Sequence, residues 1–309
     1  MARLSEPERA AGPSSCVNLE EVRASCTDCP PAAPRFGPRV GLSWFWRTIE
    51  GQEGEKIVEM QLHPELGGRN HRPVVREADD DWFAVNENTP TDKLIGWTLE
   101  RFAGQRIIMT TSFGMEGCAL IDMYARHEKP LTCVYLDTMF FFPETHKLRE
   151  QMAERYPSIR FVNRGTTLTP EEQEKKYGAE LWKHKPELCC KIRKVDPMYP
   201  VMGEADVWIT GLRRSQSANR ANLRVIDWDW KYQVLKVSPL ANWERSEIWE
   251  YIQKHDVPYN ELHERGYPTV GCTHCTVPVA GTKLGDYSRA GRWSTSEKTE
   301  CGLHGGAGI

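Results

Sequence analysis

The 309-residue sequence has no long apolar run and no large excess of charge of either sign. A membrane-spanning helix needs about 20 consecutive apolar residues, and VGLSWFW at residues 40–46 is far shorter. Lys and Arg number 40 against 43 Asp and Glu, which gives a net charge of −3. We therefore expect neither a membrane protein nor a nucleic-acid-binding one, and any anion site must come from local clustering of cations.

The first residues also lack the apolar segment of a secretory signal peptide. MARLSEPERAAGPSS has acids and prolines where that segment would stand, so we expect a cytoplasmic protein. Thiols stay reduced in that compartment. The ten cysteines are therefore expected to be catalytic or metal-bound rather than paired in disulfides.

Residues 1–80 lack the periodic spacing of apolar residues that the rest of the chain shows. CTDCPPAAPRFGPR (26–39) is rich in proline and READDDW (76–82) is a run of charge, so a disordered or loosely attached extension is predicted. It holds Cys16, Cys26 and Cys29, but no second pair follows nearby to complete a zinc site. A later start of translation, at Met60, is an alternative explanation of this segment.

From about residue 90 the apolar pattern alternates between that of strands and that of helices. This alternation predicts an α/β domain over residues 81–288 with a doubly wound, mostly parallel sheet. In such a sheet the ligand binds beyond the carboxyl ends of the strands. Strands are predicted at 106–113, 131–138, 159–164, 205–214 and 232–240, and helices at 92–102, 116–127, 143–156 and 244–256.

Three predicted strands are followed by loops that suit an anion: TTSFGMEG (110–117), YLDTMFFFPET (135–145) and TGLRRSQSANR (210–220). The first begins a helix and can leave backbone N–H groups free for phosphate or sulfate, although it is neither a Walker nor a Rossmann loop. Each loop alone has an ordinary alternative, a glycine-containing turn or a solvated charged loop. The residues concerned are Ser112, Gly114 and Gly117 in the first loop and Arg213, Arg214 and Arg220 in the third.

The motifs SFGMEG, LDT…FPET and TG-x-RR-x-QS-x-x-R together resemble the phosphosulfate reductases of sulfate assimilation, relatives of the PP-loop ATP pyrophosphatases. The resemblance covers residues 85–305 and implies an adenine nucleotide alpha-hydrolase-like fold. Phe113 and Glu116 replace the Gly and Asp of the pyrophosphatase motif S-G-G-x-D-S, which favours a reductase over ATP cleavage. The substrate contacts implied are Ser112, Gly114, Leu136, Asp137, Thr138, Gly211, Arg213, Arg214, Gln216 and Arg220.

Two cysteine pairs stand out, Cys189-Cys190 in PELCCKIRKV and Cys272-x-x-Cys275 in GCTHC. A disulfide between neighbours is strained, whereas adjacent thiolates can reach different irons of one 4Fe–4S cluster. A zinc ion with four cysteines is the alternative. Within the family, CC…CxxC marks the adenylyl-sulfate (APS) reductases. The resemblance therefore implies one 4Fe–4S cluster with an electrostatic and structural role, and Lys194 between cluster and substrate.

The segment 289–309 contains Cys301 in KTECGLH, is rich in glycine and is predicted to be a mobile tail. An accidental surface thiol is one explanation of Cys301. However, ECGLH resembles the C-terminal catalytic motif of the same family, which implies that Cys301 is the nucleophile. Arg289 and Arg292 in RAGRW are spaced to clamp phosphate or sulfate and would favour the thiolate. His304 is a candidate for an assisting role.

The reaction that the resemblance implies begins with attack of Cys301 on the sulfur of APS, which releases AMP and leaves an S-sulfocysteine. Thioredoxin then releases sulfite, and since no thioredoxin-like sequence follows Cys301, an external donor is expected. Related enzymes form homo-oligomers, which is the expectation here. The alternatives are the 3′-phosphorylated substrate PAPS, an ATP pyrophosphatase or ligase of the same fold, and a non-catalytic iron–sulfur or zinc module.

Overall fold

The computed structural model describes residues 45–50, 56–61, 85–286, 289–294, 298 and 300–304. All of them belong to the second of the chain's two units, Trp44–Ile309. The strands β1 (Phe45–Glu50) and β2 (Lys56–Gln61) pair with each other in antiparallel fashion. The rest of the predicted extension, including its three cysteines, lies outside the described residues, and the predictions made for it stay predictions.

The main sheet has six strands in the order β5-β4-β3-β6-β8-β7. The first five are parallel to their neighbours, and β7 runs antiparallel to β8. The chain moves outward from β3 on one side and then returns to form β6 on the other, as the predicted doubly wound topology requires. The strands are β3 (Ile107–Thr111), β4 (Leu131–Tyr135), β5 (Ile159–Asn163), β6 (Val207–Ile209), β7 (Ile226–Asp229) and β8 (Val234–Val237).

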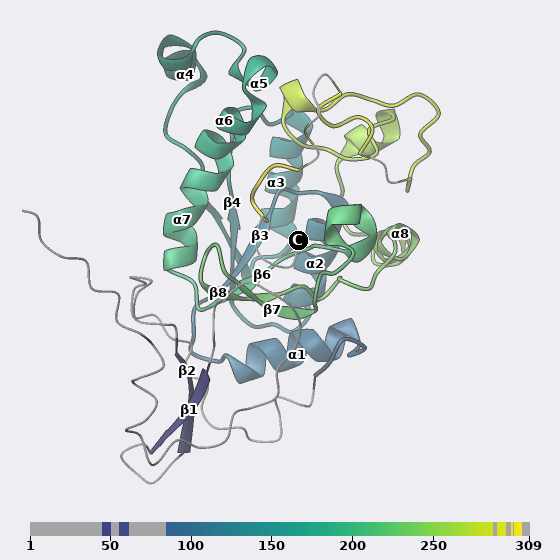
Figure 1. Ribbon diagram of the computed structural model, residues 1–309. Coiled ribbons are helices and arrows are strands. Elements are labelled where there is room, and N and C mark those ends of the chain that lie inside the picture. Colours follow the sequence, from purple (N-terminus) through teal and green to yellow (C-terminus); the bar gives the residue numbers. More distant parts are fainter. Residues whose placement is uncertain are drawn as a thin grey trace, which may run out of the picture. The chain divides into compact units, whose positions relative to one another are not determined.

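Helices cover both faces of this sheet (Figure 1). The four predicted helices are present as α1 (Thr91–Arg101), α2 (Met115–Ala125), α3 (Pro143–Arg155) and α8 (Arg245–Lys254), and their apolar residues join the core on one face. The opposite face is covered by α7 (Asp196–Gly203). Between β5 and α7 lie α4 (Pro170–Tyr177), α5 (Leu181–His184), α6 (Pro186–Cys190) and a π-helical turn, Lys191–Val195.

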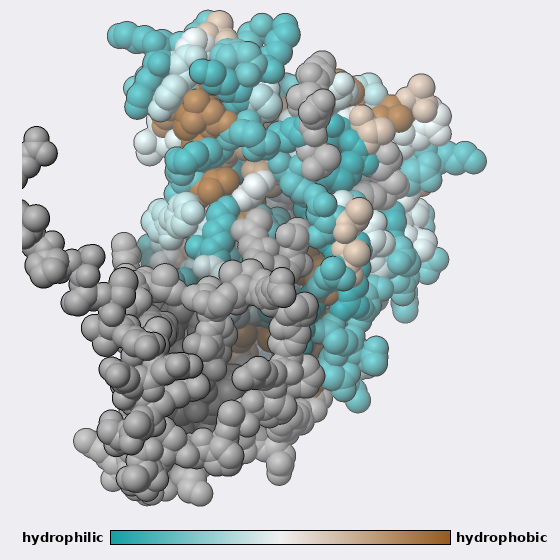
Figure 2. Space-filling model, in the orientation of Figure 1, coloured by the Kyte–Doolittle hydropathy of each residue, from teal (hydrophilic) through white to brown (hydrophobic). Residues whose placement is uncertain are grey.

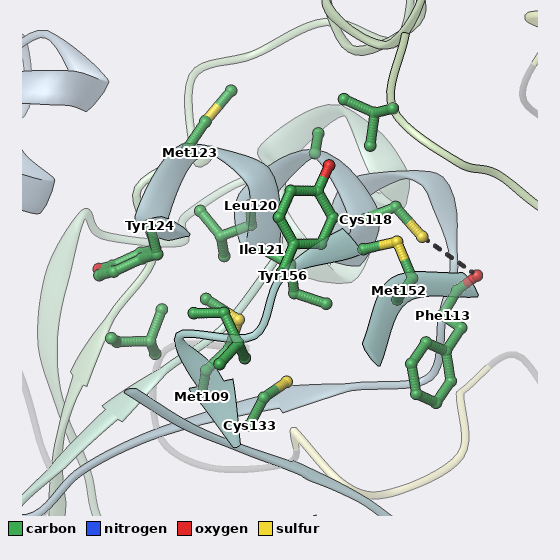
Figure 3. Close-up of a cluster of buried hydrophobic side chains, with 14 of the residues drawn as sticks. Met109, Phe113, Cys118, Leu120, Ile121, Met123, Tyr124, Cys133, Met152 and Tyr156 are labelled. Atoms are coloured by element: carbon green, nitrogen blue, oxygen red, sulfur yellow. Dashed lines mark hydrogen bonds between the residues drawn. The ribbon is translucent and has the colours of Figure 1, made fainter. Parts of the chain in front are cut away.

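The core is built from side chains that alternate along the central strands. Met109 and Cys133 pack with α2 and α3, whereas the neighbouring Ile108 and Val134 pack with α7 on the other face. Figure 3 shows Cys118 and Cys133 among these buried apolar side chains. Burial raises the pKa of both thiols. The two cysteines are therefore inert core residues.

Besides the pair of β1 and β2, two parts of this fold are not predicted from the sequence. The first is the edge strand β7, Ile226-Asp227-Trp228-Asp229, whose two aspartates obscure the strand pattern although Asp229 is buried and pairs with Lys236 of β8. The second part is the helical connection 170–203 between β5 and β6. The strand predicted at 205–214 is shorter, Val207–Ile209, because the chain leaves the sheet after it and its remaining residues form a loop.

Within the described segments, no helix combines the length and the apolar character that crossing a bilayer requires. The coloured surface in Figure 2 is mostly hydrophilic on the face shown. The large apolar side chains exposed on the described surface are Met139, Tyr199, Val277 and Leu284, with exposed fractions of 40% to 49%. Most large apolar side chains of this part of the chain are therefore in the cores on the two sheet faces.

Candidate active site

A cavity lies at the carboxyl ends of β3, β4 and β6, where the strand order reverses between β3 and β6. Ser112, Gly114, Leu136 and Gly211, which follow these strands, line it. Gly114 caps α2, so the first N–H groups of that helix and the positive end of its dipole lie at the cavity. This position in an open α/β sheet is the one at which ligands bind, and a helix N-terminus there favours an anion.

Four cationic side chains line the same cavity: Lys194, Arg220, Arg289 and Arg292. Arg220 is 6% exposed; its Nη1 donates to Gln216 and its Nη2 to Glu300. Its Nε is buried and has no partner among the described residues. A buried N–H without a partner is costly in free energy, and an oxygen of an anionic ligand would supply the missing partner.

Arg213 and Arg214, also predicted to contact the substrate, lie outside the residues that line the cavity. The Nε and Nη2 atoms of Arg213 donate to Glu116 at 3.1 and 2.9 Å. Arg214 donates to the Leu223 carbonyl at 2.7 Å and pairs with Glu87. Both arginines hold the loop after β6 in place, and a direct contact with substrate stays a prediction for each.

Glu116, which replaces the Asp of the pyrophosphatase motif, pairs with two arginines. Its carboxylate lies 2.9 Å from Arg213 and 3.5 Å from Arg245. Burial alone would raise the pKa of this carboxyl, but Arg245 and Arg213 outweigh burial and lower the pKa. Glu116 therefore connects the N-terminus of α2 with the loop after β6 and with α8.

The predicted motif Leu136-Asp137-Thr138 is divided between two places. Leu136 lines the cavity, whereas the Asp137 carboxylate accepts a hydrogen bond from the N–H of Met139 at 2.8 Å. Thr138 is fully buried, and its hydroxyl lies 3.3 Å from the sulfur of Cys272. A substrate contact stays a prediction for Asp137 and Thr138, while the structure places Thr138 beside the cysteines.

The structure brings the four predicted cluster cysteines together in one small pocket. Cys189 and Cys190 end α6, whereas Cys272 precedes a single 3-10 turn and Cys275 ends it. All four thiols are free, and Cys189, Cys190 and Cys272 are each 7% exposed. The other residues that line this pocket are Phe140, Trp182, Arg193, Lys194, His274 and Trp293.

Among the described residues, no group of three or more His, Cys, Asp and Glu side chains is placed to hold a single metal ion. An iron–sulfur cubane is bound differently, since each thiolate binds a different iron. Arg193 provides a separate test of fit. It is 1% exposed and donates from Nη1 to the Thr138 carbonyl and from Nε to Gln173, both at 2.8 Å. Its Nη2 is buried without a partner in the described part of the chain, which suits an anionic metal–thiolate group in this pocket.

Lys194 lines both the cavity and the cysteine pocket. Burial opposes the charge on Lys194, but the neighbouring Cys272, Cys301 and Cys190 outweigh burial and raise its pKa. Burial alone would likewise raise the pKa of Cys272, but Lys194 and the hydrogen bond with Thr138 lower it. The charged lysine therefore lies between the two sites.

Cys301 lines the cavity together with its neighbours Glu300, Leu303 and His304. The His304 ring stacks on Trp208 with a centroid distance of 5.2 Å and an interplanar angle of 14°. The Gly302 carbonyl accepts a hydrogen bond from Lys231. The structure thus docks residues 300–304 in the cavity, while residues 305–309 lie outside the described part, and the predicted mobility of the tail stays a prediction.

Sequence reasoning does not single out Glu300, Trp208 or Lys231 as residues of this site. Trp208 belongs to the strand pattern of β6, and Lys231 follows β7, which is itself not predicted. Glu300 directly precedes Cys301 in the motif KTECGLH. The signal available in the sequence was the unusual position of this carboxylate, directly beside a nucleophile that is expected to approach an anion.

His263 is buried beside the arginines of this site. Because of this burial, we expect the unfolding free energy of the protein to depend on pH. Its Nδ1 lies 2.7 Å from the Tyr267 carbonyl, and burial, assisted by Arg245, lowers the pKa of the ring from 6.5 to about 4. The neutral ring therefore stabilises the fold fully above pH 6.5, and this contribution is lost as the pH falls towards 4. The loss amounts to about 3 kcal/mol.

We expect His263→Asn to lose less unfolding free energy between pH 7 and pH 4.5 than the unmodified chain, as measured by urea unfolding at the two pH values. The exposed His184, replaced in the same way, provides the control. An unchanged difference in unfolding free energy between the two pH values in His263→Asn would show that this ring does not contribute to it.

The fold and the cavity together define an α/β protein of the adenine nucleotide alpha-hydrolase-like fold, with a cavity lined by cations at the carboxyl ends of its parallel strands. Residues 106–278 match the family model of the phosphoadenosine phosphosulfate reductase domain. The chain therefore belongs to this family, as its motifs predict.

Several curated relatives align with most of the chain. It is 41% identical over 230 residues to the adenosine 5′-phosphosulfate reductase of Oceanobacillus iheyensis, covering 74% of this chain and 94% of the relative. It is 39% identical over 231 residues to adenosine 5′-phosphosulfate reductase 2 of Bacillus subtilis, covering 73% and 96%. The crystal structure of a phosphoadenylyl-sulfate reductase from Candida auris, in a phosphate complex, is 30% identical, with a TM-score of 0.54 over 62% of this chain and 91% of that one.

Proposed function

We propose that the protein is an adenosine 5′-phosphosulfate (APS) reductase that forms sulfite and AMP with thioredoxin as electron donor, in sulfate assimilation towards cysteine. The names of relatives at about 40% identity support the substrate and the reaction. The observation that carries the proposal is the position of Cys301, which lines the same cavity as the α2 N-terminus and the cations. A thiol nucleophile thus lies beside an anion site.

Substrate binding follows from the charges around the cavity. The phosphosulfate group lies at the N-terminus of α2, where the backbone N–H groups and the helix dipole favour an anion. Arg220, Arg289 and Arg292 offer planar donors to its oxygens, and Lys194 adds a point charge. The adenosine occupies the remainder of the cavity, towards the loops after β4 and β6.

The chemical steps transfer the sulfur group through Cys301. Its thiolate attacks the APS sulfur, the bond from sulfur to the phosphate oxygen breaks, and its electron pair leaves with AMP. A thioredoxin thiolate then attacks the Cys301 sulfur, and sulfite departs with the electron pair of the broken S–S bond. The second thioredoxin thiol resolves the mixed disulfide, so that two thiols are oxidised as the sulfur is reduced from sulfate level to sulfite.

The four-cysteine pocket is proposed to hold one 4Fe–4S cluster through Cys189, Cys190, Cys272 and Cys275. When bound, the cluster supplies local negative charge and a structural connection between two segments. The unpaired Nη2 of Arg193 supports this assignment, because a buried cation needs a negative partner. Lys194 lines both this pocket and the substrate cavity, so its positive charge acts on the ligands of both. The proposal includes a cytoplasmic location, where thiols stay reduced, and a homo-oligomer.

The alternative of a PP-loop ATP pyrophosphatase is disfavoured by the contacts of Glu116. Its carboxylate is paired with Arg213 and Arg245 and is therefore not free for the role that an Asp has in the pyrophosphatase motif. PAPS is the nearer alternative, because it differs from APS only by the 3′-phosphate.

The function is tested by sulfite release from anaerobically purified protein with thioredoxin, in parallel assays with APS and PAPS. We expect sulfite from APS and little from PAPS. Equal or faster release of sulfite from PAPS would show that the four cysteines do not indicate APS as the preferred substrate. No sulfite from either, with ATP–pyrophosphate exchange present, would restore the pyrophosphatase alternative.

Gly271 gives a separate test of the role of Arg292. A Cβ at position 271 would lie 2.6 Å from the guanidinium carbon of Arg292, whose Nε donates to the Cys275 carbonyl at 3.2 Å. We expect Gly271→Ala to displace this flexible side chain and to weaken AMP binding about 10-fold, the effect of losing roughly one charge-assisted hydrogen bond. Isothermal titration calorimetry measures the loss.

The control for Gly271→Ala is Gly96→Ala on α1. A Cβ at position 96 makes only an ordinary contact, 3.6 Å from His127, so AMP binding should not change, and alanine should favour the helix. If Gly271→Ala binds AMP as tightly as the unmodified chain, Arg292 is not a phosphate ligand.

A further inference from the structure

The docked C-terminal segment is anchored at every second residue. Lys298 pairs with Glu187 at the start of α6, and Glu300 pairs with Arg220 and Arg289. The Gly302 carbonyl binds Lys231, and His304 stacks on Trp208. Cys301 therefore lies between two anchored residues, and its place in the cavity depends on how firmly they are held.

Glu300 has the most complete set of contacts among these anchors. One carboxylate oxygen accepts from Arg220 Nη2 at 2.8 Å and from Arg289 Nη2 at 3.4 Å. The other accepts from the Ser217 hydroxyl at 3.1 Å. The side chain of Glu300 is 22% exposed and that of Arg220 is 7% exposed, so this ion pair is screened less than one in open solvent.

The partners of Glu300 are themselves held by the fold. Ser217 lies between two consecutive short turns after β6, and Arg220 ends the second of them. Arg220 also donates to Gln216. This loop is fixed in turn by the contacts of Arg213 with Glu116. Glu300 is thus bound to a part of the molecule that lines the cavity and is connected to α2.

We propose that Glu300 is the positioning residue for the nucleophile, and that its bonds to Ser217, Arg220 and Arg289 hold the adjacent Cys301 in the cavity. Its effect on catalysis rests on the proposed function, whereas the docking of the tail does not. Attack on bound substrate needs the thiol close to the sulfur, and such positioning contributes strongly to rate. Transfer to a protein partner needs the same residue outside the cavity, so Glu300 acts on the first half-reaction alone.

The test compares Glu300→Gln with Glu300→Asp and with Glu250→Gln, an exposed residue of α8 that loses the same charge. The first readout needs no substrate: alkylation of Cys301 by iodoacetamide, followed by mass spectrometry of its peptide. Loss of the ion pair favours the undocked tail, and we expect alkylation of Glu300→Gln to be about 10-fold faster, equivalent to roughly 1.4 kcal/mol. Glu300→Asp keeps the charge, and its alkylation rate should lie between those of Glu300→Gln and the unmodified chain.

The second readout separates the two half-reactions in a single turnover. In Glu300→Gln, formation of the Cys301 sulfonate adduct at saturating APS should slow about 10-fold. Release of sulfite from preformed adduct by thioredoxin should not slow, and the AMP dissociation constant should change less than about 3-fold.

The outcomes distinguish the inference from the proposed function. Faster alkylation in Glu300→Gln, with no adduct even in the unmodified chain, would support docking by Glu300 and reject APS reduction. Alkylation and adduct formation equal to those of Glu250→Gln would overturn the inference. Weaker AMP binding with unchanged alkylation would overturn it too, since Glu300 would then act on the nucleotide and not on the tail.

Discussion

Replacing Cys301 with serine is expected to lower the rate of sulfite formation from APS by about 10³-fold or more. Serine occupies nearly the same volume, but its hydroxyl is not ionised near neutral pH and is a much weaker nucleophile than a thiolate. The cations Arg220 and Arg292 also line the substrate cavity and are unchanged in this variant. AMP should therefore bind as before.

The loss in Cys301→Ser should coincide with the absence of a sulfonate adduct when the protein is mixed with APS and no reductant. The unmodified chain should carry the adduct on the peptide that contains Cys301, detected by its added mass. An adduct on another cysteine, or substantial sulfite release by Cys301→Ser, would refute the role of Cys301.

The second large effect concerns the cysteine pocket. We expect Cys272→Ser to lose nearly all of about four irons per chain, together with the visible absorbance of the cluster and the production of sulfite. Cys272 is buried beside Thr138, and Lys194 and Thr138 lower its pKa despite its burial, so it is suited to bind as a thiolate. Its loss also removes one of the thiolates that offset the buried charges of Arg193 and Lys194.

The matched control is Cys118→Ala, which removes a thiol of the sheet core outside the pocket. This variant should keep its full iron content, although a small cavity lowers its unfolding free energy by about 1 kcal/mol. Iron retained in Cys272→Ser would contradict the assignment. Zinc in place of iron in the unmodified protein would favour the four-cysteine zinc alternative.

The central strands and their helices could be predicted because each gives a strong local signal. β3 and β4 have buried residues on both faces and are rich in apolar and β-branched residues, whereas β7 is a four-residue edge strand with two aspartates. The helices between β5 and α7 are short, and two of them begin with a proline. Their positions depend on the pocket that they enclose, and a local pattern does not contain that information.

The site was predictable as a set of loops but not residue by residue. Strand ends located Gly114, Leu136 and Arg220 at the cavity, since parallel strands place their carboxyl ends at one edge. The same reasoning did not separate Arg220 from Arg213 and Arg214. Which arginine lines the cavity depends on carboxylates far away in the sequence, 97 residues from Arg213 and 127 from Arg214.

The π-helical turn Lys191–Val195 joins the cysteine-bearing α6 to α7. Successive residues of a helix are about 100° apart around its axis, and a π turn contains an extra residue relative to α geometry. A one-residue deletion within this turn would therefore rotate Cys189 and Cys190 by about 100° relative to the face of α7 that contacts the sheet. Substitutions on the exposed side of this segment are tolerable, but its length is constrained, and natural or engineered variants should not contain insertions or deletions there.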